Sequence, residues 1–214
     1  MLPWGDLRWV GPTLSRTTTA DTFRVWRWTD DEVAQRHIDD LRDPPGTTEA
    51  GLALTHGNVP LLALARNPAR YADHYTQRVM VWDADRWVPT WELREDARGA
   101  TLLAGDAPVA RWDRRTRGRV RDTDRFVVGT AAYQPAQLQS AGRWGWTLTL
   151  TGLSVADEEG TLIQIGGRQS LTRAVDSPLP VDVRQDATPG MDLLALTLAV
   201  LASVWDTQAA ATAG

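Results

Sequence analysis

The sequence predicts a mainly β fold of the α+β kind, in which a closed antiparallel β-barrel surrounds one hydrophobic helix near the C-terminus. Most of the chain consists of short alternating or continuous apolar runs separated by turn signals, which is typical of strands. Residues 189–206 instead form a helix that is apolar all round, and such a helix must be enclosed. A helix fills a lumen that is too wide for side chains alone, which indicates a barrel of more than about eight strands.

The composition fits one globular domain spanning residues 1–214. Hydrophobic residues make up 43% and charged residues 23% of the chain, and no linker divides it. The chain has no cysteine, which excludes disulfides, thiolate metal sites and a cysteine nucleophile.

Because the net charge is only −4, a nucleic-acid partner is not expected. The first residues lack the order of a signal peptide, so we expect a cytoplasmic protein, peripheral to the membrane if it binds lipid.

Two biases mark the composition. All 23 basic residues are arginine, and there are 11 tryptophans against two phenylalanines and three tyrosines. A GC-rich genome is the simplest explanation of the arginine bias. Tryptophan suits the pleated faces of β-structure, and a sugar-binding aromatic platform is the functional alternative.

In the first half of the chain, four segments are predicted strands. Phe23–Trp28 alternates apolar and polar residues, and Val59–Ala65 is a continuous apolar run. Arg78–Trp82 and Trp87–Leu93 flank Asp83–Arg86, which reads as a four-residue hairpin loop.

Helical signals in this half are fewer. Thr29–Glu32 is a capping box, and apolar residues at helical spacing follow it, so a helix is predicted over Asp30–Arg42 and ends before Pro44–Gly46. Asn67 can open a short helix that runs to Tyr75.

The regular alternation of Arg143–Thr151 makes it the clearest predicted strand, with Leu148 and Leu150 on the face opposite its threonines. The chain then turns through Val155–Gly160 into Leu162–Ile165, and Gly160 is free to take positive φ. Gln169–Val175 is a further candidate strand.

The C-terminal helix is the most distinctive element. Thr188 can cap its start, and from Leu193 to Trp205 only Thr197 and Ser203 are polar, too far apart around the helix to make a polar face. This apolar run has 13 residues, whereas a membrane-spanning helix needs about 20. The helix is therefore expected to be buried in protein, and residues 209–214 are expected to be a flexible tail.

The C-terminal region resembles the Tubby C-terminal-like superfamily, which includes the tubby proteins, the phospholipid scramblases and the LURP-one-related proteins. The similarity is carried by Leu179–Val183 leading into Met191–Asp206, and the acidic hairpin Val155–Ile165 also fits. The scramblase branch is the most similar. The resemblance implies a barrel of about twelve strands around a central helix, with a binding or scaffolding role near membranes or phosphoinositides and no catalysis.

The chain also departs from these families. The predicted helix Asp30–Arg42 has no counterpart, and no cysteine is present for the palmitoylation of animal scramblases. Neither a scramblase calcium segment nor the phosphoinositide-binding residues of tubby match numbered positions here.

The sequence carries no signature of an enzyme. Nucleophile-elbow, phosphate-loop, dinucleotide and zinc-protease motifs are missing, and the histidines are scattered at His37, His56 and His74. Asp157–Glu159 can be read as a cation site at a hairpin tip, but a solvated turn explains these residues more simply. No catalytic residue, metal ligand or cofactor is therefore assigned.

The candidate site is the arginine-rich segment Arg111–Arg125, where seven arginines and three aspartates give a local charge of +4. Arginine offers forked donors to phosphate groups, and a tryptophan can stack on a ring or lie at a membrane interface. A solvated hairpin edge is the alternative. The residues assigned to anion binding are Arg111, Trp112, Arg114, Arg115, Arg117, Arg119 and Arg121.

Three functions are compatible with the sequence. The first is a non-enzymatic barrel that binds an anionic phospholipid or a phosphorylated ligand, and that binding should be sensitive to salt. The second is a protein-interaction or scaffolding module with an exposed apolar patch. The third is a sugar-binding or hydrolytic β-barrel with a deep pocket at one end.

Overall fold

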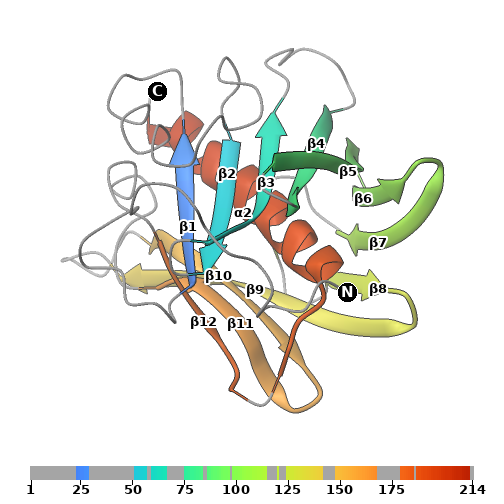
Figure 1. Cartoon of the computed structure of the whole chain (residues 1–214). Coiled ribbons are helices and arrows are strands. Elements are labelled where there is room, and N and C mark those ends of the chain that lie inside the picture. Colours follow the sequence, from blue (N-terminus) through green and yellow to red (C-terminus); the bar gives the residue numbers. More distant parts are fainter. Residues whose placement is uncertain are drawn as a thin grey trace.

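The computed structural model describes residues 23–28, 51–56, 59–66, 75–83, 86–96, 98–114, 120, 124–141, 148–167, 179–185 and 187–212. These residues form a closed antiparallel β-barrel with one C-terminal helix, α2 (Met191–Thr212), as the sequence predicts (Figure 1). The strands are β1 (Phe23–Trp28), β2 (Gly51–His56), β3 (Val59–Arg66), β4 (Tyr75–Asp83), β5 (Arg86–Asp96), β6 (Gly99–Ala104), β7 (Ala107–Asp113), β8 (Arg125–Val128), β9 (Ala131–Ala141), β10 (Leu148–Asp157), β11 (Gly160–Gly166) and β12 (Leu179–Val183).

The barrel is a simple meander in which each strand pairs with the strands before and after it in the sequence. The ring closes where β1 pairs with β12, with Phe23 opposite Val181 and Val25 opposite Leu179. Closure leaves neither of these strands with an unpaired edge, which is how a barrel avoids the hazard of exposed backbone groups.

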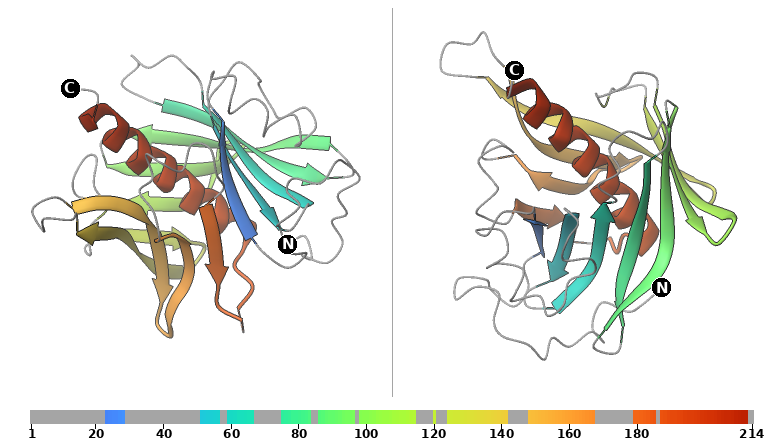
Figure 2. Two further views of the ribbon diagram at one scale, coloured as in Figure 1. Left: turned by 90° about the vertical axis from the view of Figure 1, so that its left-hand side faces the viewer. Right: turned by 90° about the horizontal axis from the view of Figure 1, so that it is seen from above.

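Helix α2 runs through the barrel (Figure 2). Every residue from Leu193 to Ala202 is buried, and the helix lies against β2, β3, β6, β7, β8 and β10. Its two central polar residues are both satisfied: the Thr197 hydroxyl donates to the carbonyl of Leu193 at 2.7 Å, and the Ser203 hydroxyl donates to the Glu95 carboxylate on β5 at 3.0 Å. The all-round burial that the sequence predicts is thus confirmed.

The ends of α2 differ from the prediction. The Leu194 amide donates to the carbonyl of Gly190 at 3.1 Å, so Gly190 takes the capping position that the sequence assigned to Thr188. The helix also continues past Asp206 to Thr212, and the prediction of a tail from Ala209 onward is wrong for Ala209–Thr212. Alanine has the highest helix propensity, which explains the longer helix.

The strand predictions for the first half of the chain hold. Phe23–Trp28 is β1, and Val59–Ala65 lies within β3, where every residue from Leu61 to Leu64 is buried. A continuous apolar run is expected where both faces of a strand are covered. The predicted four-residue loop is wrong, because Asp83, the last residue of β4, pairs with Arg86, the first residue of β5, leaving only two residues between them.

The later hairpin also forms, with Gly160 at a φ of 117° where β10 turns into β11. Residues 148–151 of the predicted strand Arg143–Thr151 lie in β10, but its alternation breaks there. Leu150 pairs with Gln139 and Gly152 with Leu138, so Thr151 is the extra residue of a β-bulge, and it is 2% exposed rather than outward-facing.

Several predicted segments lie outside the described residues. They are the helix Asp30–Arg42, residues 67–74 of the short helix, residues 143–147 and the strand Gln169–Val175. Tyr75, at the end of the predicted short helix, instead begins β4.

The sequence patterns did not identify β2, β6, β7, β8 or β9. β9 is the clearest case, because it is rich in alanine and glutamine and contains Pro135, a composition that disfavours strands. It nevertheless pairs along β10 on one side and β8 on the other. The neighbouring strands, rather than local propensity, therefore decide its conformation.

Candidate functional site

The candidate segment connects two strands of the barrel. β7 and β8 form an antiparallel hairpin whose last pair is Asp113 opposite Arg125, so the chain from Arg114 to Asp124 leaves and re-enters the barrel at adjacent positions. Within the hairpin, Trp112 lies opposite Phe126, and both side chains are buried at 1% and 0% exposure. Trp112 therefore points into the barrel, and Arg111 and Asp113 point out.

Trp112 joins the two ends of this connection. Its indole Nε1 donates to Oδ2 of Asp124 at 3.3 Å, and Asp124 is fully buried. The guanidinium carbon of Arg114 lies over the face of the same ring, 5.0 Å from its centroid. Residues at the start and the end of the connection thus contact the same buried ring.

Arg114 also forms an ion pair inside the barrel. Its Nη1 donates to Oε1 of Glu95 at 3.2 Å, and the two side chains are only 4% and 14% exposed. The Ser203 hydroxyl donates to the same oxygen. The Glu95 carboxylate therefore ties the connection after β7 to both β5 and the central helix.

Of the seven predicted anion-binding residues, the structure describes three. Trp112 and Arg114 lie in the interior, which does not agree with an exposed ring at a membrane interface. Arg111 is exposed, and its guanidinium binds Asp113 through two contacts of 2.6 and 2.8 Å. The remaining four lie outside the described residues: Arg115, Arg117, Arg119 and Arg121.

Two exposed arginines on the outer face beside the hairpin each pair with a carboxylate of their own strand. Arg94 pairs with Glu92 on β5, as Arg111 does with Asp113 on β7. Residues 115–121, in contrast, contain four arginines and no acidic residue. The excess positive charge of the candidate segment therefore belongs to these residues and not to the outer wall.

Glu95 and Ser203 were missed by the sequence reasoning, although each carried a signal. Ser203 is one of two polar residues in an apolar helix, and such a residue needs a hydrogen-bond partner. Glu95 stands two residues after Leu93, so both share one face of the strand, and Leu93 is fully buried.

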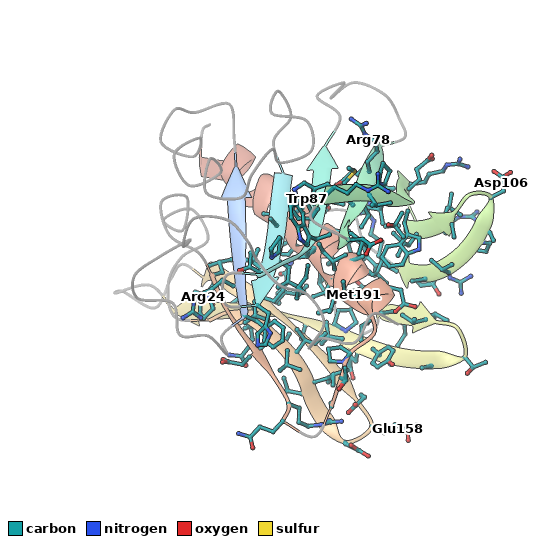
Figure 3. The ribbon with its side chains drawn as sticks, in the orientation of Figure 1. Arg24, Arg78, Trp87, Asp106, Glu158 and Met191 are labelled. Atoms are coloured by element: carbon teal, nitrogen blue, oxygen red, sulfur yellow. The ribbon has the colours of Figure 1, made fainter. Side chains whose placement is uncertain are left out.

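The acidic hairpin tip holds a guanidinium. Nη1 and Nη2 of Arg184 donate to the two carboxylate oxygens of Asp157 at 2.8 and 2.9 Å, and Nη2 also contacts Glu159 at 2.8 Å. Glu158 lies at the tip of the same hairpin, away from the barrel (Figure 3). The described residues contain no cluster suited to a metal ion, and a cation at this tip would have to compete with Arg184.

The hydrogen bonds from Arg184 lower the pKa of Asp157 below its ordinary value of 3.8. We expect their contribution to stability to be present above the unfolded-state pKa of about 3.9 and to be lost as the pH falls through the lower folded-state value. Thermal denaturation of the wild type and of Asp157→Asn between about pH 6 and about pH 2 checks this. The wild type should be more stable at the upper end, and the difference should shrink with acidification; a constant difference would contradict it.

His56 stacks on Phe23, with ring centroids 4.3 Å apart and an interplanar angle of 19°. This contact gives the histidine a packing role between β1 and β2. His37 and His74 lie outside the described residues.

Comparison of the chain with protein-family models, with curated proteins and with solved structures finds no match. Within the described part of the chain, no helix has both the length and the apolar character needed to cross a bilayer.

Proposed function

We propose that this protein is a non-enzymatic binding barrel that recognises an anionic ligand, either a phospholipid head group or a phosphorylated molecule, through the arginines between β7 and β8. One observation supports this most: the ends of the connection are held by buried contacts, Arg114 to Glu95 and Trp112 to Asp124. Between them, residues 115–121 concentrate four arginines without a carboxylate.

The anchoring matters because binding costs less when the chain that carries the ligand-binding groups is already constrained. Arginine guanidinium groups present planar pairs of donors that match phosphate oxygens, and such contacts weaken as salt screens them. In this proposal Trp112 and Arg114 hold the ends of the segment, and Arg115, Arg117, Arg119 and Arg121 contact the ligand.

We further propose that the chain is related to the Tubby C-terminal-like superfamily and acts in the cytoplasm at the membrane surface, as the scramblase-like sequence pattern implies. A barrel around a buried C-terminal helix is the architecture that this resemblance led us to expect. The proposed role is binding or scaffolding, with no lipid scrambling by the protein itself.

Co-sedimentation with vesicles tests the proposal. We expect the purified protein to sediment with anionic vesicles at low salt, but not with neutral vesicles and not at high salt. A variant with alanine at positions 115, 117, 119 and 121 should lose this binding. A matched control replaces four exposed arginines elsewhere with alanine, for the same change in net charge: Arg78, Arg86, Arg94 and Arg98.

The outcomes separate the candidate functions. Equal loss in both variants would show that only net charge matters and would contradict a site between β7 and β8. Absence of binding under every condition would reject the anionic ligand and turn attention to protein partners, whose binding to apolar surface should resist salt.

A further inference from the structure

A buried glutamine in the barrel wall needs hydrogen-bond partners that the described residues do not supply. Gln77 is 1% exposed, and it faces the barrel interior because Arg78 beside it is exposed and Val79 next along the same face is in the core. Neither Oε1 nor Nε2 of Gln77 has a hydrogen-bond partner within the described structure. Buried amide groups are nearly always hydrogen-bonded, to protein or to an ordered water.

Gln77 lies beside the Glu95 cluster, which consists of Glu95 and its two partners Arg114 and Ser203. On the paired strands β4 and β5, Gln77 is opposite Leu93 and Tyr75 is opposite Glu95, so Gln77 and Glu95 are diagonal neighbours on the inner face. Diagonal neighbours stand about 7–8 Å apart at their Cα atoms, within reach of long side chains. The Gln77 amide makes no direct hydrogen bond to Glu95, and a water molecule can link two polar groups that do not meet directly.

We propose that one enclosed water molecule bridges the Gln77 carboxamide and the Glu95 carboxylate. The water accepts a hydrogen bond from Nε2 of Gln77 and donates one O–H to Oε1 of the same amide. Its second O–H donates to the Glu95 carboxylate. These bonds give the water about three partners, which is the usual number for a buried water, and they satisfy both polar atoms of the amide.

The water bridge extends the Glu95 cluster to a fourth part of the fold. Glu95 already joins β5, the connection after β7 and the central helix through Arg114 and Ser203. With the water, β4 enters the same network through Gln77. This inference concerns the interior only and does not depend on the proposed anion binding.

Water contacts measured by NMR test the proposal. In the ¹⁵N-labelled protein, the side-chain amide protons of Gln77 are assigned by their loss in Gln77→Met, an apolar replacement of similar length. We expect these protons to show NOE and ROE cross-peaks of opposite sign to the water resonance, the signature of a long-lived neighbouring water and not of proton exchange. The exposed Gln139 serves as the control and should show no such pair.

The stability of Gln77→Met gives an independent outcome. If the amide is hydrated, the variant should have an unchanged or lower melting temperature than the wild type, because it loses satisfied hydrogen bonds. A dry amide predicts the opposite, since removing an unsatisfied buried polar group stabilises a protein. A folded wild type without the cross-peaks, together with a higher melting temperature for Gln77→Met, would overturn the proposal.

Discussion

Leu198→Asp is expected to prevent folding. Leu198 is 1% exposed near the middle of the buried stretch of α2, and barrel strands surround the helix. An aspartate there would be a charge enclosed by apolar side chains, with a cost of several kcal/mol. A domain of this size has a total stability of only about 5–15 kcal/mol. Soluble expression and thermal denaturation of the purified variant measure the effect.

A matched control separates this effect from a general response to added negative charge. Thr130 lies in the exposed turn between β8 and β9, so Thr130→Asp should leave the melting temperature close to that of the wild type. If Leu198→Asp were as soluble as this control and melted at the same temperature, the enclosed helix would be the wrong description of the core.

Glu95→Ala is expected to produce the second largest loss of stability. The substitution removes the carboxylate that Arg114 and Ser203 both contact, at a place where the Arg114 side chain is 4% exposed. Removing one partner of a buried ion pair costs about 3–5 kcal/mol, because the remaining charge keeps its desolvation penalty. Urea denaturation followed by tryptophan fluorescence measures the free energy of unfolding.

Glu92 provides the control on the same strand. It faces outward, and its ion pair with Arg94 is exposed, so Glu92→Ala should cost no more than about 1 kcal/mol. Ser203→Ala should fall between the two, since it removes one hydrogen bond, worth about 1 kcal/mol, and leaves the ion pair in place. Equal effects of the two glutamate substitutions would mean that the buried pair does not stabilise the fold.

For the connection between β7 and β8, the sequence predicts the charge of the segment but not which of its side chains face the interior. The charge of Arg111–Arg125 is evident from the sequence, and so is the alternation that places residues on opposite faces. Which face is interior depends on pairing with β6 and β8, and neither strand was predicted. From the sequence alone, Trp112 and Arg114 were therefore assigned to the same anion-binding group as the other arginines of the segment, although both point into the barrel.

The sequence by itself determined the central helix and, through it, the barrel. A helix that is apolar on every side, as in Leu193–Trp205, must be enclosed by the rest of the protein, and the rest of this chain is patterned as strands, so local composition was enough to indicate the architecture. Hairpins such as β10–β11 were also predictable, because alternation and turn residues act over short distances.

Only the tertiary structure decided which polar residues meet. Ser203 and Glu95 are 108 positions apart in the sequence, and the barrel brings their side chains to 3.0 Å. Such a contact depends on the register of the strands and on the rotation of the helix, which are set by the packing of the whole core and leave no local pattern. Because Glu95 is largely buried near the end of β5, its carboxylate forms the ion pair that holds Arg114 in the interior.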